Sequence, residues 1–432
     1  MNHTRSGGKI SRITGLVVHA VGVRARIGDL CRFHGGGLLQ PLLAEVVGLD
    51  GEEVVLLPIG SVEGLSFTTV VESMGAGLTI PGPSALLGRV VDGFCQPLDD
   101  LPLHGLTQHE VRGKVPSPLR RPIVDAYFHT GVRAIDGLLT VGIGQRVGVF
   151  AGPGTGKTSL LSAIANNADV DAVIVGLIGE RGREVREFMR EGIAAGMRDR
   201  SVVVVATSDR PASERVKAAH VACAIAEAMR DEGKHVLLVM DSLTRFCRAL
   251  REVGLAAGEP PVRRGFPPSV FAALPQLIER AGRDERGSIT AFYTVLVEGA
   301  IGSDPVSEEA MSLLDGHIVL SSELAAASHY PAIDILASRS RVAQNVCMAE
   351  QLMQAAHVRR LMAAYKKSEL LMRLGEYRSG HDAELDEAVV KHAAIGSFLR
   401  QSLGDPCPSD IMRAELVQLA ATGNAAPDHD DG

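Results

Sequence analysis

Continuous apolar runs recur through the centre of the chain, and segments of helical character separate them. The runs are 146–150, Ala172–Ile178, Ser201–Ala206, His235–Met240 and Ile289–Leu296. Runs of this kind are typical of parallel strands that are buried on both faces. Candidate helices lie between them, for example Ala212–Arg230. The pattern predicts an α/β core from about residue 123 to residue 345.

The N-terminal part has a different pattern. Between residues 9 and 75, short β-rich runs alternate with glycines, and Asp50-Gly51 separates two of these runs. This dipeptide is a strong signal for a tight hairpin turn. We therefore expect a small all-β barrel or sandwich, followed by a Gly- and Pro-rich connection over residues 76–122.

The strand pattern stops at about residue 346. Apolar residues at helical spacing predict a long helix over Ala349–Glu376 and a second helix over Glu384–Leu403. The last residues, 421–432, are short, acidic and polar. Such a composition predicts a disordered tail.

The composition excludes several classes of function. The 432 residues are 46% hydrophobic and 22% charged, as expected for a globular protein with a large core. The formal net charge of −7 argues against a general role in binding nucleic acid. The six cysteines form no C-x-x-C pair, which favours reduced thiols over a zinc site. Since no apolar stretch approaches the ~18–20 residues that span a bilayer, we expect a soluble protein that can dock on a membrane complex.

A phosphate-binding loop directly follows the apolar run that ends at Phe150. Residues 151–158 read Ala-Gly-Pro-Gly-Thr-Gly-Lys-Thr, with Ala151 where the strict pattern has glycine. The glycines let successive N–H groups point at one anion, Lys157 can reach the β/γ-phosphates, and the Thr158 hydroxyl can bind Mg²⁺. A helix is expected to follow, with its positive end towards the phosphates. The predicted nucleotide-binding residues are Gly152, Pro153, Gly154, Thr155, Gly156, Lys157, Thr158 and Ser159.

Two acidic residues follow buried strands. Asp241 ends the fourth apolar run, where the aspartate of phosphate-loop NTPases holds the Mg²⁺ shell. Glu180 follows the second run, where a carboxylate can polarise the water that attacks the γ-phosphate. Spacing alone leaves a second reading open, in which Glu180 forms a solvated ion pair with Arg181 or Arg183.

Two further features fit a nucleotide site. Arg339 and Arg341 come near the end of the α/β core, and a guanidinium that reaches the γ-phosphate stabilises the charge of the transition state. The residues alone do not choose between these two arginines. Tyr330 can stack on adenine or be an ordinary core tyrosine.

Taken together, these motifs resemble the type III secretion ATPases of injectisomes and flagella, and more distantly the catalytic subunit of rotary F-type ATP synthases. The resemblance runs from about residue 80 to residue 400. It is carried by the phosphate loop and by Gly88–Gly93, Thr130–Leu139, Gly144–Ala151, Gly176–Val185, Met240–Arg245, Gly258–Pro261, Gly265–Phe271, Leu314–His317, Tyr330–Asp334 and Gly375–Tyr377.

The resemblance implies a RecA-like P-loop core over residues 79–345. An N-terminal β-barrel over 9–78 would hold the oligomer together, and a helical domain over 346–420 would face the export substrate. It also implies catalytic roles for Lys157, Glu180 and Arg341, with Arg341 supplied by a neighbouring subunit. Tyr330 matches the adenine-stacking aromatic. Residues 304–312 depart from the sequence that is usual in the family, and this departure is expected to alter a subunit or pore contact.

The function implied is ATP hydrolysis, with Mg²⁺, by a homohexameric ring that releases chaperones from export substrates, unfolds them and feeds them into the secretion apparatus. The implied partners are a central stalk, stator or regulator proteins, export substrates and chaperones, at the cytoplasmic face of the inner membrane. The text around Gly131–Gly144 favours an injectisome over a flagellum. A rotary ATP synthase subunit and a Rho-like RNA translocase are the alternatives. The second would need a basic, aromatic β domain, whereas residues 9–75 have Phe33 and Phe67 but no Trp or Tyr.

Overall fold

The computed structural model describes residues 7–103, 105, 108–113, 115–299, 302, 304–402 and 404–421. The chain forms two compact units. The first comprises Met1–Ile123, Ile143–Ala151 and Val170–Leu314, and the second comprises Val124–Gly142, Gly152–Asp169 and Asp315–Gly432. Most of the predicted tail therefore lies outside the described residues.

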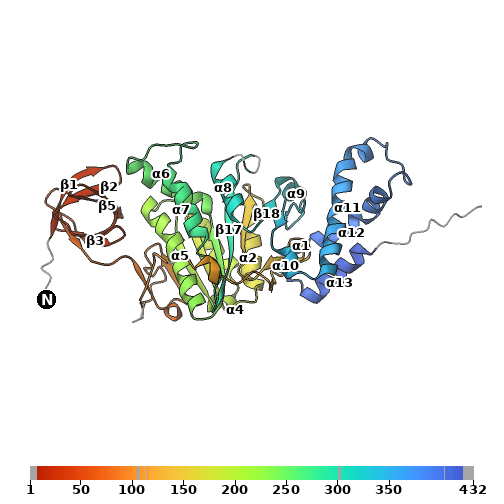
Figure 1. The fold of residues 1–432 in the computed structure, drawn as a ribbon, viewed down its shortest axis with the longest axis horizontal. Helices are drawn as coiled ribbons and strands as arrows, with labels where there is room; N and C mark the ends of the chain where they lie inside the picture. Colours follow the sequence, from red (N-terminus) through yellow and green to blue (C-terminus); the bar gives the residue numbers. More distant parts are fainter. Residues whose placement is uncertain are drawn as a thin grey trace, which may run out of the picture. The chain divides into compact units, whose positions relative to one another are not determined.

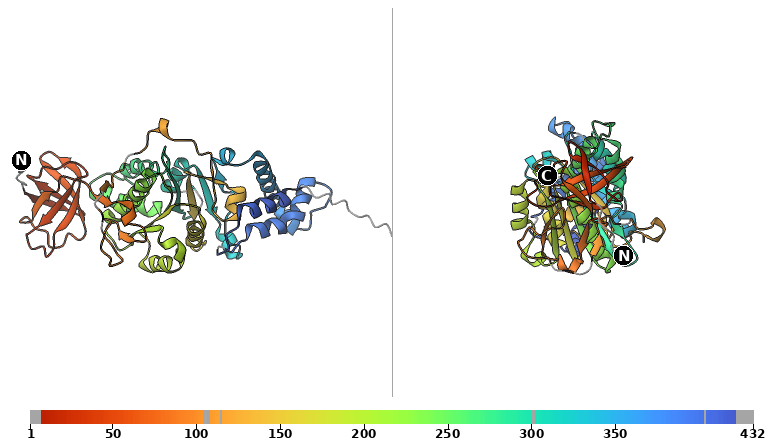
Figure 2. Two further views of the ribbon diagram at one scale, coloured as in Figure 1. Left: turned by 90° about the horizontal axis from the view of Figure 1, so that it is seen from below. Right: turned by 90° about the vertical axis from the view of Figure 1, so that its left-hand side faces the viewer.

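The first unit opens with a closed six-stranded barrel, drawn in red in Figures 1 and 2. Its strands, in the order in which they pair, are β1 (Gly8–Thr14), β2 (Val17–Val21), β5 (Glu53–Ile59), β4 (Leu42–Asp50), β3 (Leu30–His34) and β6 (Val70–Ser73). The predicted hairpin is confirmed, because Asp50 pairs with Glu53 and Gly51 has a φ of 59°. The barrel alternative of the sequence analysis is therefore correct.

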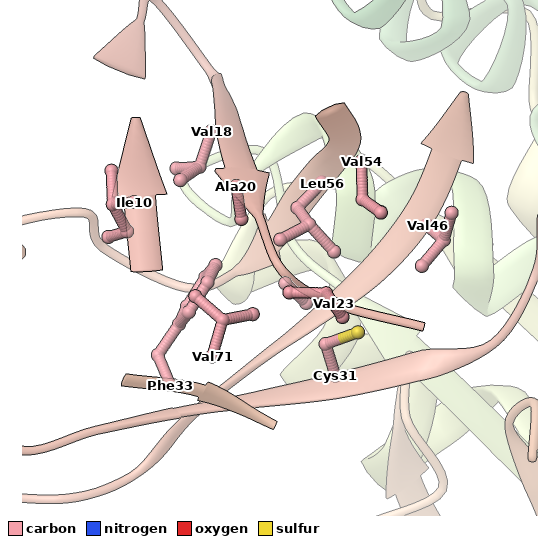
Figure 3. Packing of buried hydrophobic residues seen from close by; sticks show 11 residues of the cluster. Ile10, Val18, Ala20, Val23, Cys31, Phe33, Val46, Val54, Leu56 and Val71 are labelled. Atoms are coloured by element: carbon pink, nitrogen blue, oxygen red, sulfur yellow. The ribbon is translucent and has the colours of Figure 1, made fainter. Parts of the chain in front are cut away.

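Alternating side chains fill the barrel. Phe33, Leu56 and Val71 are fully buried at its centre, and Figure 3 shows them with the other members of this apolar cluster. Burial of apolar area from all six strands stabilises the closed form.

The predicted parallel sheet follows in the same unit. Its strands run in the order β12 (Arg146–Ala151), β17 (Ser288–Leu296), β15 (His235–Asp241), β13 (Ala172–Ile178), β14 (Ser201–Ala206) and β8 (Val90–Asp92), and every adjacent pair is parallel. Five of these strands coincide with the predicted apolar runs. β8 comes from the Gly- and Pro-rich connection, where the sequence predicted no strand. Short antiparallel pieces are β7 (Thr79–Pro81) with β9 (Gln108–Glu110), and β16 (Gly282–Arg283) on β17.

Helices flank this sheet. They are α3 (Gly182–Glu187), α4 (Ala195–Arg198), α5 (Ala212–Asp231), α6 (Leu243–Ala256), α7 (Pro268–Ile278) and α8 (Pro305–Leu313). α5 is the predicted Ala212–Arg230 helix. α8 carries the segment that departs from the family text, and Asp304 caps it by accepting bonds from the N–H groups of Val306 and Ser307 at 3.0 and 3.2 Å. The change of sequence therefore still supports a helix.

The second unit holds the phosphate loop and the C-terminal helices. Its elements are β10 (Tyr127–Phe128), α1 (Arg133–Leu138), β11 (Val141–Gly142), α2 (Lys157–Asn167), β18 (Gly316–Leu320), α9 (Ser322–Ala326), β19 (Arg339–Ser340), α10 (Ala343–Val346), α11 (Ala349–Arg373), α12 (Ala383–Leu399) and α13 (Ser409–Ala420). Helices α11–α13 pack on one another and on α1.

The C-terminal helices differ from the prediction in their ends and in their number, and α11 ends at Arg373 rather than Glu376. α12 ends at Leu399 rather than Leu403, because Arg400 is extended and Gln401 bonds to other parts of the unit. Pro406 and Pro408 then precede a third helix, α13, that the sequence analysis missed. None of the helices that the structure describes is long and apolar enough to cross a membrane.

Candidate active site

The phosphate loop follows β12 in the chain and curls as its glycines require. Gly154 and Gly156 have φ values of 74° and 82°, which side chains rarely allow. The Thr155 hydroxyl is buried and donates to the Gly152 carbonyl at 2.9 Å, which closes the loop on itself. The helix expected after the loop is α2, and it begins at Lys157.

The start of α2 suits an anion. Gly156 is the N-cap and has no side chain to occupy the first N–H groups of the helix. Thr158 and Ser159 are exposed in the first turn. A phosphate placed there would meet backbone N–H groups, the helix dipole and the Thr158 hydroxyl together.

Tyr330 lies beside this loop within the second unit. A Cβ built on Gly156 would be 3.4 and 3.5 Å from the Cε1 and Cδ1 atoms of the Tyr330 ring. Tyr330 is 42% exposed, so it is a poor candidate for a core tyrosine and is accessible to a ligand.

In the first unit, the two predicted acidic residues come from neighbouring parallel strands. β13 and β15 are paired with Leu177 opposite Asp241, so Glu180 and Asp241 belong to the same, carboxyl-terminal edge of the sheet. Ligands bind at this edge in α/β folds. Asp241 is buried and accepts a hydrogen bond from the Thr294 hydroxyl at 2.6 Å, which orients the carboxylate.

Glu180 is 4% exposed and lies against an arginine that the sequence analysis did not single out. Arg245 Nε and Nη2 donate to its two carboxylate oxygens at 3.1 and 3.2 Å. Gly179 makes this approach possible, because it has a φ of 73° and a Cβ there would lie 2.9 Å from Arg245 Cδ.

The alternative ion pairs of Glu180 are not formed. Arg181, the N-cap of α3, lies 3.7 Å from Glu184, and Arg183 lies 3.5 Å from Glu187; both arginines are exposed. The solvated pair considered from the sequence is therefore wrong. Glu180 instead has a half-buried, bidentate partner in Arg245, which keeps its oxygens fixed.

The two candidate arginines lie on either side of Ser340. Arg339 belongs to β19 and lies opposite His317 in the antiparallel pair of β18 and β19. Arg341 follows the strand and donates its backbone N–H to the Asp315 carbonyl at 2.9 Å. Both side chains are exposed. Burial lowers the pKa of His317, and the two guanidinium groups lower it further, while a hydrogen bond to the Ala337 carbonyl opposes them.

The donor set fits the ion that ATP chemistry requires. Asp241 and Thr158 offer a carboxylate and a hydroxyl, which are the hard oxygen ligands that Mg²⁺ prefers. Mg²⁺ held by oxygens of this kind would neutralise charge on the phosphates of ATP.

Comparison with known proteins identifies the family. Three family models match the chain in order: the ATP synthase alpha/beta family β-barrel domain over residues 10–75, the nucleotide-binding domain of that family over 131–340, and the type III secretion EscN ATPase C-terminal domain over 347–418. The type 3 secretion system ATPase of Sinorhizobium fredii is 52% identical, over 91% of this chain and 88% of that protein. The chain belongs to the type III secretion ATPase family.

Other relatives agree with this membership. The flagellum-specific ATP synthase of Bacillus subtilis is 43% identical over 96% of this chain and 95% of that protein. The assembled ATPase EscN of the enteropathogenic E. coli type III secretion system has a TM-score of 0.91 and 47% identity, over 96% of this chain and 100% of the EscN chain. The predicted family and fold are confirmed, and this type III secretion ATPase is an ATP-hydrolysing enzyme.

Proposed function

We propose that this ATPase hydrolyses MgATP in a homohexameric ring and thereby drives proteins into a type III secretion apparatus. The observation that carries the proposal is the buried Glu180, held by Arg245 at the same sheet edge as Asp241. Glu180 would be the base, Lys157 and the start of α2 would bind the phosphates, and Asp241 and Thr158 would hold Mg²⁺.

The chemistry divides among these groups as follows. Glu180 accepts a hydrogen bond from the attacking water and draws electron density onto its oxygen. Lys157 and the N–H groups of the loop balance charge on the transferred phosphoryl group. Tyr330 stacks on the base. Arg341 of the neighbouring copy meets the charge that develops in the transition state, so one chain alone binds ATP and turns it over slowly.

Relatives support a ring with an axial partner. One solved relative is described as the assembled ATPase EscN in complex with its central stalk EscO, and it matches this chain with a TM-score of 0.89. We propose the same kind of stalk partner here. Residues 9–78 would hold the ring together, 79–345 would bind ATP, and 346–420 would receive export substrates and chaperones, with stator or regulator proteins at the cytoplasmic face of the inner membrane.

An injectisome is the proposed setting, because the secretion ATPases of Sinorhizobium and Xanthomonas, at 52% and 50% identity, match better than the flagellar relative of Bacillus, at 43%. Expression in a strain that lacks its own export ATPase, with secretion of needle or flagellar proteins as the readout, tests this choice. Restored flagellin export without needle export would overturn it.

Turnover against protein concentration tests the shared site. The rate per subunit should rise as rings assemble, with the rise tracking the ring fraction seen by light scattering. A flat profile across the assembly transition would contradict a site completed by a neighbour.

A further inference from the structure

Gln401 joins three separate segments of the second unit. Its Oε1 accepts a hydrogen bond from the Arg133 N–H at 2.8 Å, and its Nε2 donates to the carbonyls of Gly131 and Asp405 at 2.7 and 2.8 Å. Its backbone N–H donates to the Tyr330 carbonyl at 3.0 Å. Both ends of the amide are thus engaged, and an amide turned by 180° would set donor against donor and acceptor against acceptor.

The two segments that matter here lie at opposite ends of α2. The Tyr330 ring packs against Gly156, where the helix begins. At the other end, a Cβ built on Gly131 would come within 2.8 Å of the Cβ of Asn167, the last residue of the helix. Gln401 therefore bonds to one residue that abuts the start of the phosphate-loop helix and one that abuts its end.

A second tie keeps the residue before Gln401 in place. The Arg133 guanidinium donates to the Arg400 carbonyl at 2.6 Å and to the Glu415 carboxylate of α13 at 2.9 Å. The chain that leaves α12 is therefore bonded to Arg133 of α1 at both Arg400 and Gln401. The backbone N–H of Gln401 then donates to the Tyr330 carbonyl. A shift of α12 would therefore move the Tyr330 ring.

We propose that Gln401 is a positioning residue for ATP, which sets the Tyr330 ring at the distance from the phosphate loop that an adenine needs. The inference rests on the proposed function, in which Tyr330 stacks on the base. It adds that the C-terminal helices are coupled to base affinity through Gln401, which lies two residues after the end of α12. Gln401 touches no reacting atom, so its effect should fall on KM rather than on kcat.

Steady-state kinetics of Gln401→Ala in the full-length, assembled enzyme test this role. The KM for ATP should rise about five-fold while kcat stays within about two-fold, because only ground-state binding of the base is weakened. Inorganic triphosphate, used as a competitive inhibitor, has no base, so its inhibition constant should not change. A role confined to folding would not separate these two constants.

Gln351→Ala is the matched control. Gln351 also ties a C-terminal helix to α1, since its Nε2 donates to the Asp136 carbonyl at 3.1 Å and the Thr140 hydroxyl at 3.4 Å. Within the part of the chain that the structure describes, Gln351 makes no hydrogen bond to Tyr330. This variant should lower the melting temperature and leave the KM for ATP unchanged. Gln401→Glu is a nearly isosteric second variant, in which a carboxylate faces the two carbonyls; it should also raise KM, and less so at low pH, where the protonated acid can donate.

Tyr330→Ala distinguishes failure of the positioning role of Gln401 from failure of the proposed function on which that role rests. If this variant leaves both constants unchanged, the base-stacking site itself is wrong. If Tyr330→Ala raises the KM for ATP alone, while both Gln401 variants leave it unchanged or Gln351→Ala raises it equally, the positioning role is overturned and the proposed function stands.

Discussion

Arg245 grips Glu180 through two hydrogen bonds of 3.1 and 3.2 Å, although the two residues are 65 positions apart in the chain. Arg245 lies in the first turn of α6, whose N-cap is Ser242, and Asp241 is the residue before that cap. The start of α6 therefore directly follows Asp241, the proposed metal ligand, and carries Arg245, which holds Glu180, the proposed base. Removing Arg245 should disturb the base and leave the phosphate loop intact.

Arg245→Ala should lower kcat by about 10²-fold, within the range for losing a general base. A buried carboxylate that loses one neighbouring cation binds a proton more readily, so the acidic limb of the pH–rate profile should move to higher pH. Phosphate-release assays at several pH values measure both kcat and the position of the acidic limb. Arg248→Ala is the control on the same helix, since among the described residues Arg248 pairs with the exposed Glu298 alone, and it should keep wild-type turnover. Equal losses in the two variants would refute the special role of Arg245.

Lys157→Ala should remove most ATP binding and turnover, because no other side chain of the loop carries a positive charge to the phosphates. Fluorescence titration with a labelled ATP analogue and a phosphate-release assay check the two effects separately. Lys366→Ala, at an exposed position of α11, should behave as wild type. Full activity of Lys157→Ala would show that the loop assignment is wrong.

Arg341→Ala should leave ATP affinity nearly intact and cut kcat by about 10³-fold or more, as expected for an arginine that acts on the transition state. Arg339→Ala, two residues away on β19, should change kcat by much less. Measured Kd and kcat for both variants decide between the arginines that the sequence left open. A fall in affinity without a fall in turnover per bound ATP would exclude the finger role of Arg341.

The His129–Asp136 contact predicts a pH dependence of stability. Asp136 lies 3.0 Å from His129 and raises the pKa of this histidine, chiefly by hydrogen bonding, against the effect of partial burial. The folded pKa is above the unfolded value of about 6.5. The stabilisation is therefore complete below pH 6.5 and is lost as pH rises through the folded value.

The matching experiment is urea denaturation of the wild type and His129→Gln from pH 5.5 to 9. The difference in unfolding free energy between them should be largest at acid pH and shrink as pH rises. A difference that is constant, or that grows with pH, would mean that the charged histidine does not stabilise this contact.

Much of the fold was visible in the sequence, because its signals were local. Five buried parallel strands showed as apolar runs, and the Asp50-Gly51 turn and the helix after the phosphate loop carried their own residue patterns. β8 was missed, since three residues inside a Gly- and Pro-rich connection give no periodicity. α13 was missed because only three of its twelve residues are buried, Met412, Leu416 and Leu419.

The site was predictable where its residues are consecutive and hidden where partners are distant. The phosphate loop needs one short stretch of chain, so spacing found it. The partner of Glu180 was misjudged, because neighbouring Arg181 and Arg183 were weighed and the distant Arg245 was not. Its only signal was its place in the Met240–Arg245 segment. Gln401 gave no signal at all, since its role depends on contacts that only the folded chain creates.

The central claim is that each ATP site uses groups from two neighbouring copies, and mixing two inactive variants tests it most directly. Glu180→Gln keeps Arg341, and Arg341→Ala keeps Glu180, so each alone should be nearly inactive. In rings assembled from an equal mixture, about one quarter of the interfaces should pair an intact Glu180 with an intact Arg341. ATP turnover should therefore return to about a quarter of the wild-type rate. A mixture as inactive as its parts, in rings shown to contain both chains, would contradict the shared site.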